Sequence, residues 1–383
     1  MHFLVFPIVA TLLLWILHGW ASSCFPWLGR HKRWLAAVLG ALLVVEVVAR
    51  RIELRWHVGG TFQTVCVVIV MTLVVAAAPI GAMRVSSYLL SRLRRRPSKV
   101  AEAPQTMTRR QVVEATGGVA LLGVTGSMMG WGIVRGRTAF ELCEIPVHIP
   151  GLPRTLDGYV IVQVSDIHTG IHLGERELDE GFELVRRARP DLIVATGDLV
   201  DSDTAFAPLV ARKLADLAAR DGVFACLGNH DYYAGADVVE QTLRAAGVTP
   251  LVNEGRLVRV GDGGGFALLG VDDQWSYRYE RSGPLLAQAA TGVPEQTPRI
   301  LLSHQPPTVD RWAGQVALQL SGHTHGGQIN PGGLRPADLF YKYIAGRYVV
   351  GQTTLYVNRG FGTVGPPARL WAPPEITRIV LVA

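Results

Sequence analysis

Long uncharged apolar stretches in the first third of the chain constrain its fold more than any other feature. A helix needs about 20 apolar residues to cross a bilayer, so we predict four transmembrane helices. They span residues 3–20, 34–49, 65–83 and 117–134. The second is the weakest, because it is short and Glu46 interrupts it. Arginine clusters between the stretches disfavour the alternative, that they are core helices of a soluble domain. Residues 1–137 are therefore expected to form an all-α, multi-span membrane region.

Basic residues between the apolar stretches predict the orientation of this region. The segment 84–110 carries eight Lys and Arg residues, and the positive-inside rule makes it a cytoplasmic loop. The two earlier loops carry three basic residues each, so together they favour neither orientation. We therefore expect a multi-pass protein of the cell membrane, in contact with the lipid bilayer, whose residues after 134 lie outside the cytoplasm. This expectation holds whether or not residues 34–49 span.

The net charge of the chain divides near the same place. Residues 1–140 hold 16 basic and 4 acidic residues, whereas the remainder holds 21 basic and 27 acidic residues. The basic excess is thus explained by membrane topology, and the acidic remainder argues against a nucleic-acid partner. The four cysteines form no CxxC pair, which argues against a disulfide scaffold or a thiolate metal site. The sequence does not indicate an oligomeric state.

Strand and helix patterns alternate after a predicted linker at 138–155. Helices are expected at 175–189, 207–220 and 238–246, from the spacing of their apolar residues. The predicted strands are 159–165, 192–196, 223–227, 257–260, 266–270, 300–303, 316–320, 355–358 and 376–382. A βαβαβ start followed by further short strands predicts a layered α/β sandwich over residues 156–383.

Polar residues of a few types follow five of these strands. The motifs are Asp166-Ile167-His168, Gly197-Asp198, Gly228-Asn229-His230, Ser303-His304 and Gly322-His323-Thr324-His325. Each motif alone is also typical of a surface turn. Ligand sites in α/β sheets form beyond the carboxyl ends of strands, so we expect the five to converge. Carboxylate, amide and imidazole groups suit manganese, iron or zinc, and seven ligands fit two ions that share a bridge.

These motifs, in this order and spacing, resemble those of the calcineurin-like metallophosphoesterase superfamily. Residues Gly322–Ile329 and Asn358–Pro367, with the N-terminal membrane region, resemble more narrowly its bacterial transmembrane branch. That branch includes exported phosphoesterases and proteins similar to UDP-2,3-diacylglucosamine pyrophosphatases. The resemblance covers residues 156–383 and implies a layered αββα sandwich.

The resemblance also implies a role for each residue of the motifs. The first metal is expected on Asp166, His168 and His325, the bridge on Asp198, and the second metal on Asn229, His304 and His323. His230 is implied to be catalytic, facing the substrate phosphate and protonating the leaving oxygen. Asp201 or Asp231 would orient the His230 ring by a hydrogen bond on the side away from the substrate. The implied cofactors are two divalent ions, manganese first, with iron or zinc as alternatives.

Together these features predict a membrane-anchored hydrolase of a phosphodiester or pyrophosphate bond in a lipid-linked or envelope substrate. Metal-activated hydroxide would attack phosphorus directly. One alternative is a UDP-2,3-diacylglucosamine pyrophosphatase of lipid A synthesis, which would need a cytoplasmic active site, opposite to the predicted orientation. A second is a catalytically inactive membrane sensor or scaffold, which is disfavoured because every expected ligand position is filled.

Overall fold

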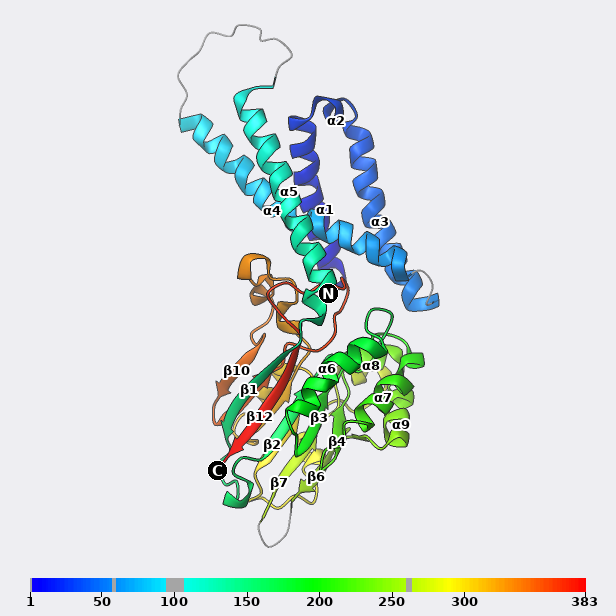
Figure 1. The fold of residues 1–383 in the computed structure, drawn as a ribbon, viewed down its shortest axis with the longest axis vertical. Coiled ribbons are helices and arrows are strands. Elements are labelled where there is room, and N and C mark those ends of the chain that lie inside the picture. Colours follow the sequence, from blue (N-terminus) through cyan, green and yellow to red (C-terminus); the bar gives the residue numbers. More distant parts are fainter. Residues whose placement is uncertain (1, 57–59, 94–106, 260–263) are drawn as a thin grey trace. The chain divides into compact units, whose positions relative to one another are not determined.

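The computed structural model describes residues 2–56, 60–93, 107–259 and 264–383 (Figure 1). The chain divides into two compact units, Met1–Trp131 and Gly132–Ala383. The first unit is helical, and the second contains two β-sheets with helices around them.

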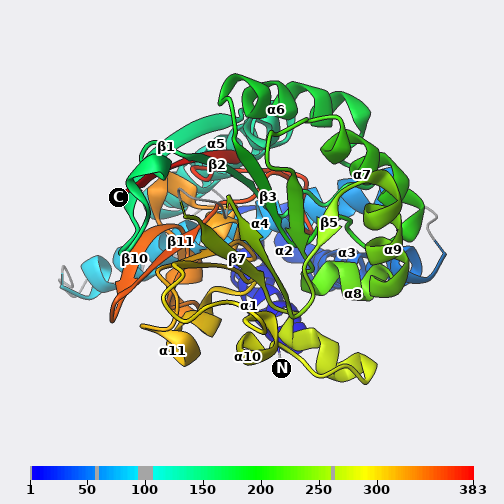
Figure 2. The same cartoon turned by 90° about the horizontal axis from the view of Figure 1, so that it is seen from below.

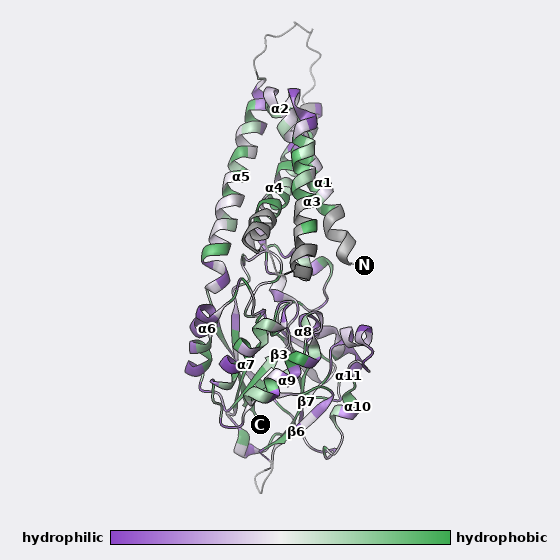
Figure 3. Cartoon of the chain, turned by 90° about the vertical axis from the view of Figure 1, so that its right-hand side faces the viewer, coloured by the Kyte–Doolittle hydropathy of each residue, from purple (hydrophilic) through white to green (hydrophobic). Residues whose placement is uncertain are grey.

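The helical unit consists of α1 (His2–Cys24), α2 (Pro26–Arg30), α3 (Lys32–Trp56), α4 (Gly60–Leu93) and most of α5 (Arg109–Val134). Small residues let α1 and α4 pack closely, because Ala76 and Ala77 of α4 belong to the same buried cluster as Leu14 and Trp20 of α1. Figure 3 shows apolar residues along these helices, whereas α6 of the second unit is mainly hydrophilic.

Each predicted transmembrane span lies within one helix of this unit. By length and composition, two helices of the described residues could cross a membrane, Val68–Leu90 and Arg109–Thr138, while Val9–Cys24 is apolar but shorter. The two candidates overlap the spans predicted at 65–83 and 117–134. Spanning by residues 3–20 and 34–49 stays a prediction.

The predicted basic loop at 84–110 differs from the structure at both ends. Helix α4 continues through residue 93, and α5 already begins at residue 109. Arginine and leucine are good helix formers, so the basic sequence after residue 84 does not end the helix. Residues 94–106 of the predicted loop lie outside the described residues.

Two six-stranded sheets form the centre of the second unit. The first has the order β1 (Glu141–His148), β12 (Glu375–Val382), β2 (Val160–Val164), β3 (Leu192–Thr196), β4 (Val223–Cys226) and β5 (Thr249–Pro250). The second has the order β10 (Gly346–Val350), β11 (Thr353–Val357), β9 (Leu318–Ser321), β8 (Arg299–Leu302), β7 (Phe266–Gly270) and β6 (Glu254–Val258). Strands β2 to β5 are parallel, as are β7, β8, β9 and β11.

The sheets stack face to face because their strands are apolar on both sides. In β2, Val160, Val162 and Val164 face one way and pack with α6 (Glu175–Arg187). Ile161 faces the other way and packs with the second sheet. The helices α7 (Ala207–Ala215), α8 (Asn229–Ala234) and α9 (Ala236–Ala246) lie beside the first sheet, and α10 (Leu286–Ala289) and α11 (Val309–Trp312) beside the second (Figure 2). The predicted layered sandwich is confirmed.

Besides the two-residue strand β5, two strands lie where the sequence predicts none. Residues 141–148, assigned to a linker, form β1 and pair in parallel with β12. Residues 346–350 form β10 and pair with β11. Both lie at sheet edges and are largely exposed, so their sequences lack the continuous apolar run that marks a buried strand.

Candidate metal centre

The polar motifs converge where parallel strands of both sheets end. Asp166 follows β2, Asp198 follows β3 and Asn229 opens the helix after β4. From the second sheet, His304 follows β8, and His323 and His325 follow β9. Potential ligand atoms lie within 4.8 Å of one another in three groups: Asp166, His168 and His325; His168, Asp198 and His230; and Asp198, His304 and His323.

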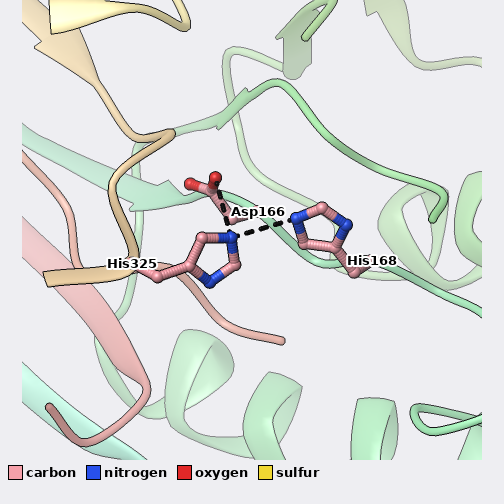
Figure 4. A group of neighbouring side chains, drawn as sticks. All are labelled: Asp166, His168 and His325. Atoms are coloured by element: carbon pink, nitrogen blue, oxygen red, sulfur yellow. Dashed lines mark hydrogen bonds and ion pairs between the residues drawn. The ribbon is translucent and has the colours of Figure 1, made fainter. Parts of the chain in front are cut away.

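The first group is buried and closely packed (Figure 4). Nε2 of His325 lies 3.1 Å from Nε2 of His168 and 3.5 Å from Oδ1 of Asp166. The Asp166 carboxylate also accepts the backbone N–H of His323, with distances of 2.8 and 3.0 Å to its two oxygens. One carboxylate thus holds the loop of the second sheet against the first.

Asp198 lies between the first group and the last. Its Oδ2 is 3.6 Å from Nε2 of His168 and 3.2 Å from Nε2 of His304. Nδ1 of His323 lies 3.2 Å from that same His304 nitrogen. The Nδ1 of His304 donates to the carbonyl oxygen of Thr196 at 2.8 Å, which leaves Nε2 as the nitrogen directed at the centre.

Asn229 fits a metal ligand for a separate reason. Its Oδ1 is buried and has no hydrogen-bond partner among the described residues. Burying an unpaired carbonyl oxygen is unfavourable, and a cation would satisfy it. The carboxylate, amide and imidazole donors therefore suit divalent ions of the manganese, iron and zinc type.

The backbone is strained at the same residues. Five non-glycine residues of the groups have φ between +49° and +73°: Asp166, His168, Asp198, His323 and His325. This left-handed conformation costs about 1–3 kcal/mol for such residues and is concentrated at functional sites. Gly228 allows the tight fit, because a Cβ there would lie 2.2 Å from Oδ1 of Asp198.

Burial and mutual charge set the protonation states of the metal-free centre. Burial and the nearby His304 lower the pKa of His323 to about 3, and burial and His168 lower that of His325, so both are neutral and able to bind metal. Burial lowers the pKa of His304, but Asp198 outweighs it and leaves that pKa well above its usual value. Burial raises the pKa of Asp198, but His304, His230 and His168 together leave it well below its usual value.

His230 lies beside the groups and is held by Asp201. Its Nδ1 donates to the Asp201 carbonyl oxygen at 2.6 Å and lies 3.4 Å from the Asp201 carboxylate. Although burial lowers the pKa of His230, the charge of Asp198 and the bond to Asp201 raise it to about 9. The ring is thus protonated at neutral pH in the metal-free centre, and Nδ1 is engaged, so Nε2 is the nitrogen left to donate a proton.

Of the two carboxylates expected behind His230, Asp201 makes the contact. The hydrogen bonds of Asp231 go instead to backbone N–H groups of Leu199, Val200 and Gly228, at 2.9, 3.2 and 2.9 Å. Asp231 thus fixes the loop that carries Asp198.

The sequence analysis missed Arg369, which is buried beside the first group. Its guanidinium donates to the carbonyl oxygens of Arg359, Gly360, Gly362 and Ala372 and lies 3.2 Å from Nδ1 of His325. Burial lowers the pKa of Arg369 to about 9. Backbone carbonyls are its main partners and every residue supplies one, so no sequence motif marks this arginine.

Comparison with known proteins agrees with this geometry. Residues 159–327 match the family described as calcineurin-like phosphoesterase. A Danio rerio transmembrane protein with metallophosphoesterase domain is 33% identical over 304 residues, 76% of this chain and 67% of that protein. A Bos taurus protein of the same name is 37% identical over 258 residues, 64% of this chain and 57% of that protein.

A bacterial relative is similar over nearly its whole length. An uncharacterised metallophosphoesterase of Bacillus subtilis, YkuE, is 31% identical over 284 residues, which are 72% of this chain and 98% of that protein. The resemblance inferred from the strand-end motifs is confirmed: the chain belongs to the calcineurin-like metallophosphoesterase family.

Proposed function

We propose that the chain is a membrane-anchored phosphoesterase that uses two divalent ions to hydrolyse a phosphodiester or pyrophosphate bond. The observation that carries this proposal is the position of Asp198. One of its oxygens lies 3.6 Å from His168 and 3.2 Å from His304, so a single carboxylate reaches both ligand groups. A carboxylate has two oxygens and can bridge two ions.

Each of the two ligand groups is proposed to hold one ion. Asp166, His168 and His325 would hold one ion, with Asp198 as the bridge. Asn229, His304 and His323 would hold the other. Bound divalent ions lower the pKa of a coordinated water and offset charge on phosphoryl oxygens, which is the chemistry that phosphoester hydrolysis needs. Manganese is our first candidate, and iron and zinc share the same donor preference.

His230 is proposed to donate a proton to the leaving oxygen. The contact with Asp201 fixes the ring and leaves Nε2 free, and the pKa of about 9 keeps that nitrogen protonated. Bound cations would lower this pKa toward neutrality, because they offset the negative charge of Asp198. A pKa near the working pH is the favourable range for an acid catalyst.

The proposed membrane anchor and orientation rest on the helical unit. Two of its helices are long and apolar enough to span, and the basic residues near 84–110 favour a cytoplasmic position for that segment. The catalytic unit would then be extracytoplasmic, with a lipid-linked or envelope substrate. Alkaline phosphatase fused to the C-terminus should be active in cells. An inactive alkaline phosphatase fusion, together with fluorescence from a cytoplasmic reporter fused to the same end, would contradict this orientation.

Loss of hydrolysis on ligand substitution tests the catalytic proposal. We expect Asp198→Ala and His323→Ala to abolish manganese-dependent hydrolysis of an aryl phosphate diester by the purified full-length chain. Asp179→Ala is the matched control, because that carboxylate is exposed and pairs with Lys213 on the surface. Full activity in either ligand variant would contradict the proposal.

A further inference from the structure

Four exposed apolar side chains lie on two segments next to the candidate metal centre. Leu334, Leu339 and Phe340, from the segment that follows His325, have 75%, 82% and 63% of their surface exposed, and Trp371 has 54%. Single exposed apolar residues are ordinary, but four on adjoining segments mark an interaction surface. We call these four side chains the apolar rim.

Hydrogen bonds join the two segments that carry the apolar rim. Asn330 donates its backbone N–H to the Leu370 carbonyl oxygen at 2.9 Å and its side-chain amide to that of Trp371 at 3.4 Å. Leu334 follows Asn330 by four residues, so the first segment leaves this junction directly. Trp371 has a positive φ of 51°, which bulky residues rarely adopt.

Both segments also reach the metal-ligand groups. The guanidinium of Arg369, two residues before Trp371, lies 3.2 Å from Nδ1 of His325. On the other segment, the ring of Tyr341 lies 6.2 Å from the ring of His323, between centroids. The two segments that carry the apolar rim therefore lie beside residues of both ligand groups.

The end of α5 is fixed at the same place. Gly132, which belongs to the catalytic unit, accepts the backbone N–H of Arg369 at 3.2 Å. A Cβ on Gly132 would lie 3.0 Å from the Leu370 side chain, so the helix end and this segment are in close contact. Helix α5 is part of the candidate span Arg109–Thr138. The last residues of α5 therefore lie beside the segment that carries Trp371.

We propose that the apolar rim inserts into the interfacial layer of the membrane that α5 enters, so that the metal centre opens toward the lipid headgroups. Transfer of leucine, phenylalanine and tryptophan side chains from water to this layer is favourable, and tryptophan is enriched there. A phosphate at headgroup depth then reaches the centre without leaving the membrane. The substrate class is accordingly a phosphodiester or pyrophosphate of a lipid, an inference that rests on the proposed function.

Quenching by spin-labelled lipid tests the insertion directly. The full-length chain with Leu339→Cys, labelled with an environment-sensitive fluorophore, is reconstituted into phosphatidylcholine–phosphatidylglycerol vesicles. We expect a blue-shifted emission that is lost when the lipids carry a nitroxide high on the acyl chain. Leu257→Cys is the matched control, because Leu257 is also exposed but pairs with Ala267 at the amino end of β7, away from the centre. Signal from the labelled parent chain, with its own cysteines, is subtracted.

A second variant links insertion to catalysis. Leu339→Asp with Phe340→Asp should lower hydrolysis of a vesicle-embedded lipid phosphodiester by about tenfold or more, because two apolar anchors are lost. Hydrolysis of a water-soluble aryl phosphate diester should be unchanged, and Leu257→Asp should affect neither substrate.

The outcomes separate this proposal from the proposed function. Unquenched emission at position 339, whether the site is wet or covered by protein, would overturn the insertion. Equal loss of both substrates, or of neither, in the double aspartate variant would also overturn it. A parent chain that hydrolyses no ester while position 339 is quenched would leave the insertion standing and overturn the phosphoesterase assignment alone.

Discussion

The two units of the molecule differ in which side chains they bury and which they expose. In the α/β unit, Asp166, Asp198 and His304 are buried at the carboxyl ends of strands. In the helical unit, Trp15 and Trp34 are more than two-thirds exposed on helices. Buried charges need partners or ions, and exposed apolar helices need a non-aqueous surrounding. One unit thus contains candidate metal sites, and the other contains helices that are long and apolar enough to lie in lipid.

The same substitution made in both units should have very different effects. Val162 is fully buried in β2, and Val124 is exposed near the middle of the candidate span in α5. Val162→Asp should prevent folding of the α/β unit, because an unpaired carboxylate in a dry core costs several kcal/mol. Val124→Asp should leave hydrolysis of a soluble ester intact but reduce membrane integration, since a central aspartate costs about 2.5–3.5 kcal/mol in a spanning helix.

Circular dichroism and membrane fractionation of the two variants measure these effects. Unchanged fractionation of Val124→Asp would contradict the contrast between the two units, because it would mean that α5 does not lie in lipid. A folded, active Val162→Asp variant would contradict the core arrangement.

A smaller effect is expected when only proton transfer is removed from the buried centre. His230→Gln should lower kcat for an ester with a poor leaving group by about 10²–10⁴-fold, the usual contribution of an acid catalyst. Metal content should be unchanged, because His230 is not among the residues assigned as ligands. His148→Gln, an exposed histidine on β1, is the matched control. A His230→Gln variant that loses its metal instead would mean that His230 is a ligand.

The smallest expected effect is a pH dependence of stability that metal reverses. The pKa of His230 is raised to about 9 and that of His304 lies well above its usual value, so the folded metal-free chain holds protons that the unfolded chain releases near pH 6.5. The stability from these protons is complete below about pH 6.5 and is lost as the pH rises toward 9. The lowered pKa values of His323 and His325 act below this window.

Metal binding should change the sign of that trend. Imidazole ligands bind metal in their deprotonated form, so affinity for manganese rises with pH. The difference in Tm between the manganese-loaded and chelator-treated full-length chain should therefore widen from pH 6.5 to 9. Thermal unfolding at a series of pH values measures it, and a difference that narrows would contradict the assigned protonation states.

The sequence predicts the buried parts of the α/β unit better than its edges. Strands β3 and β7 lie where continuous apolar runs place them, because burial on both faces removes polar residues. The residues proposed as ligands could also be picked out, since each follows a strand within a short local motif. Edge strands β1 and β10 are not, because exposed positions tolerate charged residues.

Residues that act through tertiary contacts could not be found in this way. Arg369 is recognised only when its backbone partners are brought together by the fold. The sequence likewise offers both Asp201 and Asp231 as partners of His230, and only the course of the loops separates them. In the helical unit, length and composition of the described residues support two spans, and spanning by residues 3–20 and 34–49 stays a prediction.

The count of bound metal tests the central claim most directly. Elemental analysis of the purified full-length chain, loaded with manganese and freed of excess metal, should give two ions per chain, and Asp198→Ala should retain at most one because it loses the bridge. Ester hydrolysis should rise with occupancy and disappear with the ions. A chain that binds no metal, or an Asp198→Ala variant that keeps both ions and full activity, would contradict a centre built on one bridging carboxylate.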